Sequence, residues 1–154
     1  MDLKLGDKAP NFTLATDSGG EVTLSALKGG PVILYFYPRD NTPGCTKEAM
    51  DFSVLAKKFR AAGVTVIGLS KDSPASHDRF KAKYALDLTL ASDPETKIAQ
   101  DYGVWVEKTL YGKKSMGVER STFLIDGAGK IRGIWRKVKV EGHAEAVLAA
   151  AKQL

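Results

Sequence analysis

Two short runs of apolar, β-branched and aromatic residues stand out in the first half of the chain. Residues 32–37 read Val-Ile-Leu-Tyr-Phe-Tyr, and residues 64–69 read Val-Thr-Val-Ile-Gly-Leu. Runs of this length and composition predict buried strands. Between them, apolar side chains recur at a spacing of three and four residues: Phe52, Leu55, Ala56 and Phe59. This spacing predicts a helix that begins at Pro43 and buries one face, so the segment predicts a βαβ unit with parallel strands.

The pattern before this unit predicts a hairpin. Apolar and polar residues alternate over residues 11–15 and again over residues 22–24, on either side of the turn sequence Asp-Ser-Gly-Gly. Alternation around such a turn is typical of paired antiparallel strands. A short helical turn is expected over residues 25–28, because Gly29, Gly30 and Pro31 then break the chain.

The second half predicts more helices and a second hairpin. A helix is expected from Ser73-Pro74, a short strand over residues 88–90, and a helix capped by Asp93 that ends at Tyr102. Residues 104–114 have no clear period and predict a loop with some extended structure. Strands over residues 118–125 and 130–138 flank a turn at residues 126–129, and a last helix spans residues 143–152.

This order of elements predicts the fold class. Parallel strands come first and an antiparallel hairpin comes last, which gives a mixed central sheet with helices on both faces. We therefore expect an α/β protein with a thioredoxin-like fold and an N-terminal β-hairpin extension. The length suits a single domain over residues 1–154.

Composition and charge argue against nucleic-acid binding, a membrane protein and a disulfide-bonded protein. The net charge of +5 could indicate nucleic-acid binding, but the lysines are spread along the chain and mixed with acids, so we expect no nucleic-acid partner. No apolar stretch is long enough for a membrane span, and the charged N-terminus does not resemble a signal peptide. The single cysteine excludes an intrachain disulfide. Together these features favour a cytoplasmic protein that does not bind membranes.

The one cysteine occupies a chemically special place. Thr42 is a good helix N-cap and Pro43 suits the first helical position, so Cys45 falls in the first turn of the helix. Unpaired amides and the positive end of the helix dipole stabilise a thiolate there. Cys45 is therefore a candidate nucleophile, and the alternative is an inert buried thiol that packs as a small hydrophobic residue.

Two motifs resemble the peroxiredoxins, which are cysteine-based peroxidases. Residues 35–49, Tyr-Phe-Tyr-Pro-Arg-Asp-Asn-Thr-Pro-Gly-Cys-Thr-Lys-Glu-Ala, resemble the active-site motif of the bacterioferritin comigratory protein (Q-type) branch. Residues 119–126, Glu-Arg-Ser-Thr-Phe-Leu-Ile-Asp, are similar to that branch's second signature. Smaller agreements extend the resemblance over essentially the whole chain.

The resemblance implies a role for five residues. Cys45 would attack the peroxide O–O bond and become a sulfenic acid. Thr42 would hydrogen-bond the peroxide and the thiolate, Arg120 would hold the thiolate and polarise the peroxide, Pro38 would shield the site from water, and Glu48 would orient Arg120. The chemistry agrees, because the reaction needs a thiolate and donors aimed at the charge that develops on the leaving oxygen. It requires no metal or organic cofactor.

Each of these residues also has an ordinary structural interpretation. Thr42 could be only a helix cap, Pro38 only a strand terminator, Glu48 only an acid that complements the helix dipole, and Arg120 only a surface cation. Their coincidence at the spacing of the family favours the functional interpretation for Thr42, Pro38 and Arg120, whereas both interpretations stay open for Glu48.

The chain departs from the family at the resolving cysteine. Many Q-type members place a second cysteine at the position of Met50, and others at the position of Lys81. The chain therefore resembles a one-cysteine variant. Its sulfenic acid must react with an external thiol, such as thioredoxin, glutaredoxin or glutathione, or with Cys45 of a second chain. We expect hydrogen peroxide and organic hydroperoxides as substrates, and a monomer.

Two other functions compete with the peroxidase. A Cys–His hydrolase or transferase would need His143 within reach of the Cys45 sulfur. A non-catalytic thioredoxin-like redox sensor or chaperone would use Cys45 without turnover. Both histidines, His77 and His143, are predicted to be surface or helix-capping residues.

Overall fold

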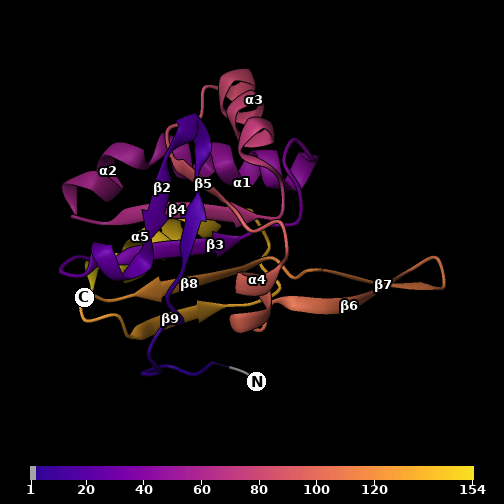
Figure 1. The fold of residues 1–154 in the computed structure, drawn as a ribbon. Coiled ribbons are helices and arrows are strands. Elements are labelled where there is room, and N and C mark those ends of the chain that lie inside the picture. Colours follow the sequence, from indigo (N-terminus) through magenta and orange to yellow (C-terminus); the bar gives the residue numbers. More distant parts are fainter. Residues whose placement is uncertain (1–2) are drawn as a thin grey trace.

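A five-stranded mixed sheet forms the centre of the molecule (Figure 1). The computed structural model describes residues 3–154. The strands run in the spatial order β5-β4-β3-β8-β9. Their bounds are Val32–Phe36 for β3, Thr65–Ser70 for β4, Thr89–Ser92 for β5, Ser121–Ile125 for β8 and Ile131–Trp135 for β9. β3 is parallel to β4, β4 is parallel to β5, and β8 is antiparallel to both β3 and β9. The predicted mixed α/β sheet is confirmed.

The central strand β3 explains why the sheet is covered on both faces. Every residue of β3 is buried. Val32, Leu34 and Phe36 belong to one hydrophobic core, whereas Ile33 and Tyr35 belong to a second core on the opposite face. Successive side chains of a strand point to opposite faces, so a strand that is apolar throughout needs a layer on each side.

The two layers differ in what they contain. One face is covered by α1 (Pro43–Val54), α2 (Ala56–Ala61), α3 (Pro74–Tyr84) and α5 (His143–Lys152), whose buried residues share the core with Tyr35. The other face is covered by α4 (Lys97–Asp101) and the N-terminal segment. In Figure 1, α1, α2 and α5 lie behind the sheet, and α4 lies in front of it with the β1–β2 hairpin. Helices on both faces were predicted, and this is confirmed.

The N-terminal hairpin is present as predicted. Strands β1 (Thr13–Ala15) and β2 (Glu21–Thr23) pair antiparallel on either side of the turn η1 (Asp17–Gly19). The expected helical turn follows as the 3₁₀ helix η2 (Leu24–Leu27). None of the helices in residues 3–154 is long and apolar enough to cross a membrane.

Two predicted helices have different bounds in the structure. The helix from Pro43 stops at Leu55, where the backbone leaves the helical region before α2 begins. Its apolar spacing continues across this break, which is why the pattern did not reveal it. The helix predicted from Asp93 begins only at Lys97, because Thr96 has a φ of 59°. The Asp93 carboxylate still accepts from the amides of Ile98 and Ala99, at 3.2 and 2.9 Å.

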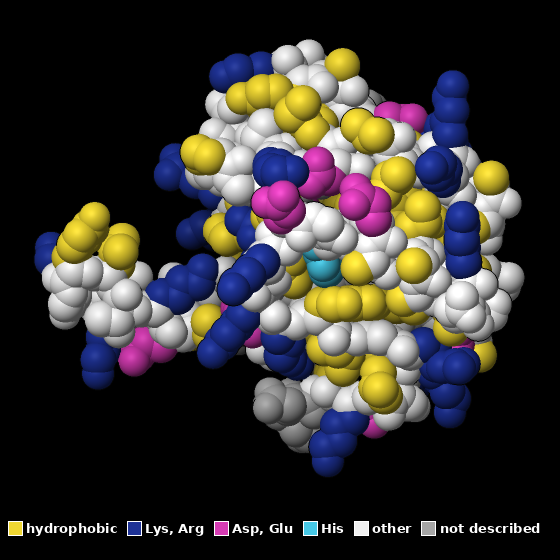
Figure 2. Space-filling view, turned by 180° about the vertical axis from the view of Figure 1, so that it is seen from behind, with side chains coloured by type: hydrophobic (Ala, Val, Ile, Leu, Met, Phe, Trp, Pro, Cys, Tyr) yellow, Lys and Arg dark blue, Asp and Glu magenta, His cyan; other side chains and the backbone are white. Residues whose placement is uncertain are grey.

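The predicted loop at residues 104–114 is wrong, because this part of the chain is an antiparallel hairpin. Strands β6 (Trp105–Leu110) and β7 (Lys113–Val118) form an arm that stands away from the body, with hydrophobic side chains at its tip (Figure 2). Tyr111 and Gly112 both have positive φ values, 52° and 77°, as a two-residue hairpin turn requires. Most of the arm is exposed on both faces, so no apolar alternation marks its strands in the sequence.

Candidate active site

Cys45 lies where the sequence placed it, in the first turn of α1. Thr42 is the N-cap residue and Pro43 is the first helical residue. The first hydrogen bond of the helix runs from the amide of Thr46 to the carbonyl of Thr42, at 2.8 Å. The amides of Gly44 and Cys45 lie before this bond, at the positive end of the helix. The Cys45 side chain is only 2% exposed, so an anionic sulfur there is stabilised mainly by these groups and by its immediate neighbours.

Arg120 is the main neighbour of the sulfur. It lies between β7 and β8, and its Nη2 atom donates to Cys45 Sγ at 3.3 Å. A Cβ atom at Gly44 would come within 3.2 Å of the same nitrogen, so the glycine lets the guanidinium approach the helix. The structure therefore brings together two motifs that are 75 residues apart in the sequence.

Glu48 holds the other arm of the guanidinium. Arg120 Nη1 donates to Glu48 Oε1 at 2.7 Å, and the Glu48 side chain is 1% exposed. Burial raises the pKa of Glu48 to about 7, although the charge of Arg120 and its hydrogen bond act in the opposite direction. Among the described residues, Glu48 Oε2 has no hydrogen-bond partner, which is consistent with this desolvation. Burial also disfavours the charged form of Arg120, but Glu48 and Cys45 outweigh it and raise the pKa of Arg120.

Thr42 and Pro38 lie on the loop that joins β3 to α1. The Thr42 hydroxyl does not cap the helix through its side chain and instead donates to the carbonyl of Arg39 at 2.9 Å. Because its proton is used in this way, the hydroxyl oxygen can accept a hydrogen bond from a ligand. Pro38 is half-buried directly after Tyr37. The structure shows no hydrogen bond between Thr42 and Cys45 in the described part of the chain.

Both histidines are buried, so of the two predicted positions, surface or helix-capping, the surface one is wrong. His143 Nε2 lies 2.8 Å from the Thr122 hydroxyl, and the ring packs edge-on against Phe52 and Trp135. Burial lowers the pKa of His143 to about 4, and the nearby charge of Arg120 adds to this effect. Within residues 3–154, His143 makes no hydrogen bond to the Cys45 sulfur, so the geometry does not support a Cys–His hydrolase.

His77 belongs to a cluster that the sequence did not reveal. Its Nδ1 atom lies 2.7 Å from Asp40 Oδ2, and the Tyr37 hydroxyl donates to Asp40 Oδ1 at 2.5 Å. Asp40 lies inside the active-site motif, but His77 is 37 residues away in α3. No local spacing connects these two positions, and only the fold places them together.

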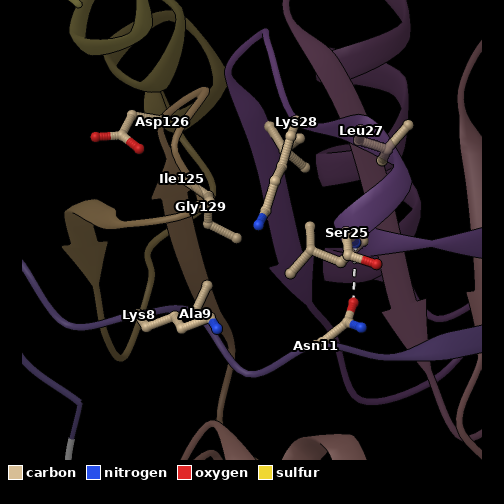
Figure 3. A pocket seen from close by; sticks show the side chains of 11 residues that line it. Lys8, Ala9, Asn11, Ser25, Leu27, Lys28, Ile125, Asp126 and Gly129 are labelled. Atoms are coloured by element: carbon tan, nitrogen blue, oxygen red, sulfur yellow. Dashed lines mark hydrogen bonds between the residues drawn. The ribbon is translucent and has the colours of Figure 1, made fainter.

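A cavity of about 90 Å³ lies at the other end of the sheet (Figure 3). Its lining includes Lys8, Ala9, Asn11, Ser25, Lys28 and Gly129. Val32, the first residue of β3, also lines it, whereas the loop to Cys45 leaves the opposite end of that strand. The cavity is therefore separate from the cysteine site. No cluster of three His, Cys, Asp or Glu side chains suited to a metal ion occurs in residues 3–154.

Comparison with known proteins places the chain in a family. Residues 5–134 match the AhpC/TSA family. A bcp protein of Coxiella burnetii is 52% identical over 148 residues, which cover 96% of this chain and 98% of the relative. Peroxiredoxin Bcp of Bacillus subtilis is 45% identical and covers 100% of this chain and 98% of its own length.

Solved structures with a similar fold come from the same group of proteins. A PrxQ variant of Xylella fastidiosa superposes with a TM-score of 0.94 at 39% identity, covering 99% of this chain and 98% of the other. The bacterioferritin comigratory protein of Xanthomonas campestris, which was studied for its alkyl peroxide reduction activity, gives a TM-score of 0.88 at 45% identity. That match covers 92% of this chain and 90% of the other. The chain belongs to the AhpC/TSA family and is a peroxiredoxin of the Bcp/Q type, a thiol-dependent peroxidase.

Proposed function

We propose that Cys45 reduces hydroperoxides by forming a sulfenic acid, which a thiol from outside the chain then removes. The observation that carries this proposal is the contact of 3.3 Å between Arg120 Nη2 and Cys45 Sγ at the N-terminus of α1. A half-buried guanidinium that donates to the sulfur at the positive end of a helix can hold a thiolate, which is the reactive form.

The first half of the cycle is a displacement at oxygen. The thiolate sulfur attacks the terminal oxygen of the hydroperoxide, an S–O bond forms, and the O–O bond breaks. Cys45 becomes a sulfenic acid, and the alkoxide that leaves takes up a proton to become an alcohol. Arg120 and the amides at the start of α1 face the negative charge that develops on the leaving oxygen. The Thr42 oxygen accepts from the peroxide hydroxyl, and Pro38 keeps water away from the sulfur.

Glu48 acts through Arg120. Its contact at 2.7 Å fixes one arm of the guanidinium, so that the other arm points at the sulfur. A planar guanidinium with two fixed donors is held more firmly than a single ammonium group would be. Glu48 is therefore a positioning residue in this proposal.

The second half of the cycle needs another molecule, because the chain contains one cysteine. An external thiol attacks the sulfenic sulfur, water leaves, and a mixed disulfide forms. A second thiol then releases Cys45 and carries away the disulfide. We propose thioredoxin, glutaredoxin or glutathione as the source, in the cytoplasm, where thiols are kept reduced. Alkyl hydroperoxides are proposed as substrates beside hydrogen peroxide, because the Xanthomonas relative is described for alkyl peroxide reduction.

The test treats the purified protein with one equivalent of peroxide and follows Cys45 by mass spectrometry. The expected product is one added oxygen on Cys45, and none in Cys45→Ser. Arg120→Ala and Thr42→Val should each slow the oxidation about 100-fold, the usual effect of removing one such donor. Unchanged rates in both variants would contradict their proposed roles.

Turnover is then measured with peroxide and each of thioredoxin, glutaredoxin and glutathione. At least one reductant should restore the Cys45 thiol repeatedly. If Cys45 is oxidised but none of the three thiols restores it, the proposed reductants are wrong. If Cys45 gains no oxygen, the proposed chemistry is wrong.

A further inference from the structure

Asp40 is a buried carboxylate with three donors. Its side chain is 4% exposed. Oδ1 accepts from the Tyr37 hydroxyl at 2.5 Å, and Oδ2 accepts from the Ser76 hydroxyl at 2.8 Å and faces His77 Nδ1 at 2.7 Å. Burial alone would raise the pKa of Asp40, but the hydrogen bonds from His77 and Tyr37 outweigh it and the pKa falls below its ordinary value. Asp40 is therefore an ionised group with a complete set of partners.

His77 is the buried side chain that faces Asp40. It is 0% exposed, and its second ring nitrogen, Nε2, lies 3.0 Å from the carbonyl oxygen of Ala91 in β5. The two ring nitrogens thus contact oxygen atoms on two different segments of the chain. The ring therefore connects three parts of the molecule: α3, the edge of the sheet and the loop that carries Asp40.

That loop, residues 38–42, determines where Thr42 and the start of α1 lie. The amide of Asp40 donates to Asp72 Oδ2 at 2.8 Å, and the Tyr84 hydroxyl donates to Asn41 Oδ1 at 2.6 Å. Asn41 has a φ of 59°, a conformation that needs support from its surroundings. Ser76, His77 and Tyr84 all belong to α3, so this helix holds the loop through contacts that do not involve Arg120.

We propose that the Asp40–His77 pair positions the peroxide-binding loop, so that α3 controls how well Cys45 reacts with peroxide. The inference rests on the proposed function and extends it to residues that do not touch the substrate. Removing either partner breaks the buried contact at 2.7 Å and leaves a polar group of the other side chain without its hydrogen bond, and the loop then relaxes away from its ordered conformation. The Thr42 hydroxyl moves with the loop, whereas Arg120 keeps its contact with the sulfur.

Because Thr42 moves with the loop and Arg120 does not, the proposal can be tested by comparing two reaction rates of Cys45. The reaction of Cys45 with hydrogen peroxide needs the loop and Thr42 in place. Its alkylation by iodoacetamide needs only an accessible thiolate. In His77→Ala, the peroxide rate constant should fall about 10- to 100-fold, the range expected when a reacting group is misplaced by up to 1 Å. The alkylation rate constant should change by less than about threefold.

Three further variants make the result specific. His77→Asn keeps a donor near Asp40 and should recover part of the peroxide rate. Asp40→Asn should reproduce the loss. Lys81→Met is the matched control in α3, because Lys81 binds Asp17 at 2.7 Å rather than the loop, and its peroxide rate should equal that of the wild type. Circular dichroism should show that each variant is folded.

The possible outcomes distinguish a failure of the positioning role from a failure of the proposed function. Equal peroxide rates in the wild type, His77→Ala and Asp40→Asn would overturn the positioning role. A parallel fall in the peroxide and alkylation rates would also overturn it, because the effect would then be on the thiol in general. A wild-type protein that does not react with peroxide would refute the proposed function itself.

Discussion

Glu48 shows how one buried side chain links the site to the stability of the protein. Its carboxyl group is 1% exposed and has a pKa raised to about 7. Between about pH 4.5 and pH 7, the unfolded chain has released this proton and the folded chain still binds it. Raising the pH through this range therefore removes stability from the folded state, by about 3 kcal/mol at 1.4 kcal/mol per pKa unit.

The expected result follows for Glu48→Gln. The amide cannot ionise, so the variant does not lose this part of its stability as the pH rises. The free energy of unfolding of the variant minus that of the wild type should therefore increase between about pH 4.5 and pH 7. Urea denaturation at several pH values measures this difference. Using the difference cancels the contributions of other groups, including His143. Glu145→Gln, on an exposed face of α5, is the control for removing one carboxylate. A difference that does not change with pH would show that Glu48 is ionised throughout.

Among single residues, the sequence pointed to the residues around the Cys45 sulfur but not to the residues that hold the neighbouring loop. Cys45, Arg120 and Thr42 were predicted as site residues from the family resemblance, and the structure places Arg120 against the Cys45 sulfur. The Arg120–Glu48 contact was expected from the resemblance and is present. The Asp40–His77 contact was missed, since a hydrogen bond across 37 residues leaves no local pattern. For the same reason, the sequence did not reveal that both histidines are buried.

At the scale of elements, the sheet supports the cysteine helix through one aromatic ring. Tyr35 of β3 lies over Gly68, its partner in β4, and stacks on Phe52 of α1 with ring centroids 4.7 Å apart. A Cβ atom at Gly68 would come within 2.7 Å of the Tyr35 ring and 2.9 Å of Leu90. The Tyr35 ring thus fills the space that a side chain at position 68 would occupy.

Gly68→Ala should therefore destabilise the protein by about 1–3 kcal/mol, the usual cost of overpacking a core. It should also speed the alkylation of Cys45, because a displaced Tyr35 loosens the packing beneath α1. Chemical denaturation and iodoacetamide labelling measure the two effects. Thr65→Ala, at an exposed position of the same strand, should stay within about 0.5 kcal/mol of the wild type. Equal stability of Gly68→Ala and the wild type would show that the ring can move aside freely.

The elements also show where sequence patterns stop being informative. The core strands were predicted because both of their faces are apolar, and the order of elements then gave the mixed sheet. The β6–β7 arm was predicted as a loop because its strands face water on both sides. The breaks at Leu55 and Thr96 depend on single backbone angles, which apolar spacing does not record.

At the scale of the whole molecule, the burial of the sulfur limits how oxidised Cys45 can react. Cys45 is 2% exposed and lies under the Arg120 guanidinium. A disulfide needs its two sulfur atoms about 2.05 Å apart, so two copies of the chain could join through Cys45 only if the start of α1 opened in both. Some of the large exposed apolar side chains lie together on the β6–β7 arm, and the others belong to separate parts of the chain, among them Leu5, Val54 and Leu154.

We therefore predict a monomer of 16.6 kDa before and after oxidation. Sedimentation velocity at micromolar concentration should give this mass for the reduced protein. After one equivalent of peroxide, non-reducing electrophoresis should show the same single chain carrying a sulfenic acid, because a disulfide between two copies needs the start of α1 to open in both, whereas an external thiol needs it to open in one. Cys45→Ser is the control for association without disulfides. A species of twice the mass that appears only in oxidised wild-type protein and is cleaved by dithiothreitol would contradict this prediction. The second chain would then be the thiol that completes the cycle.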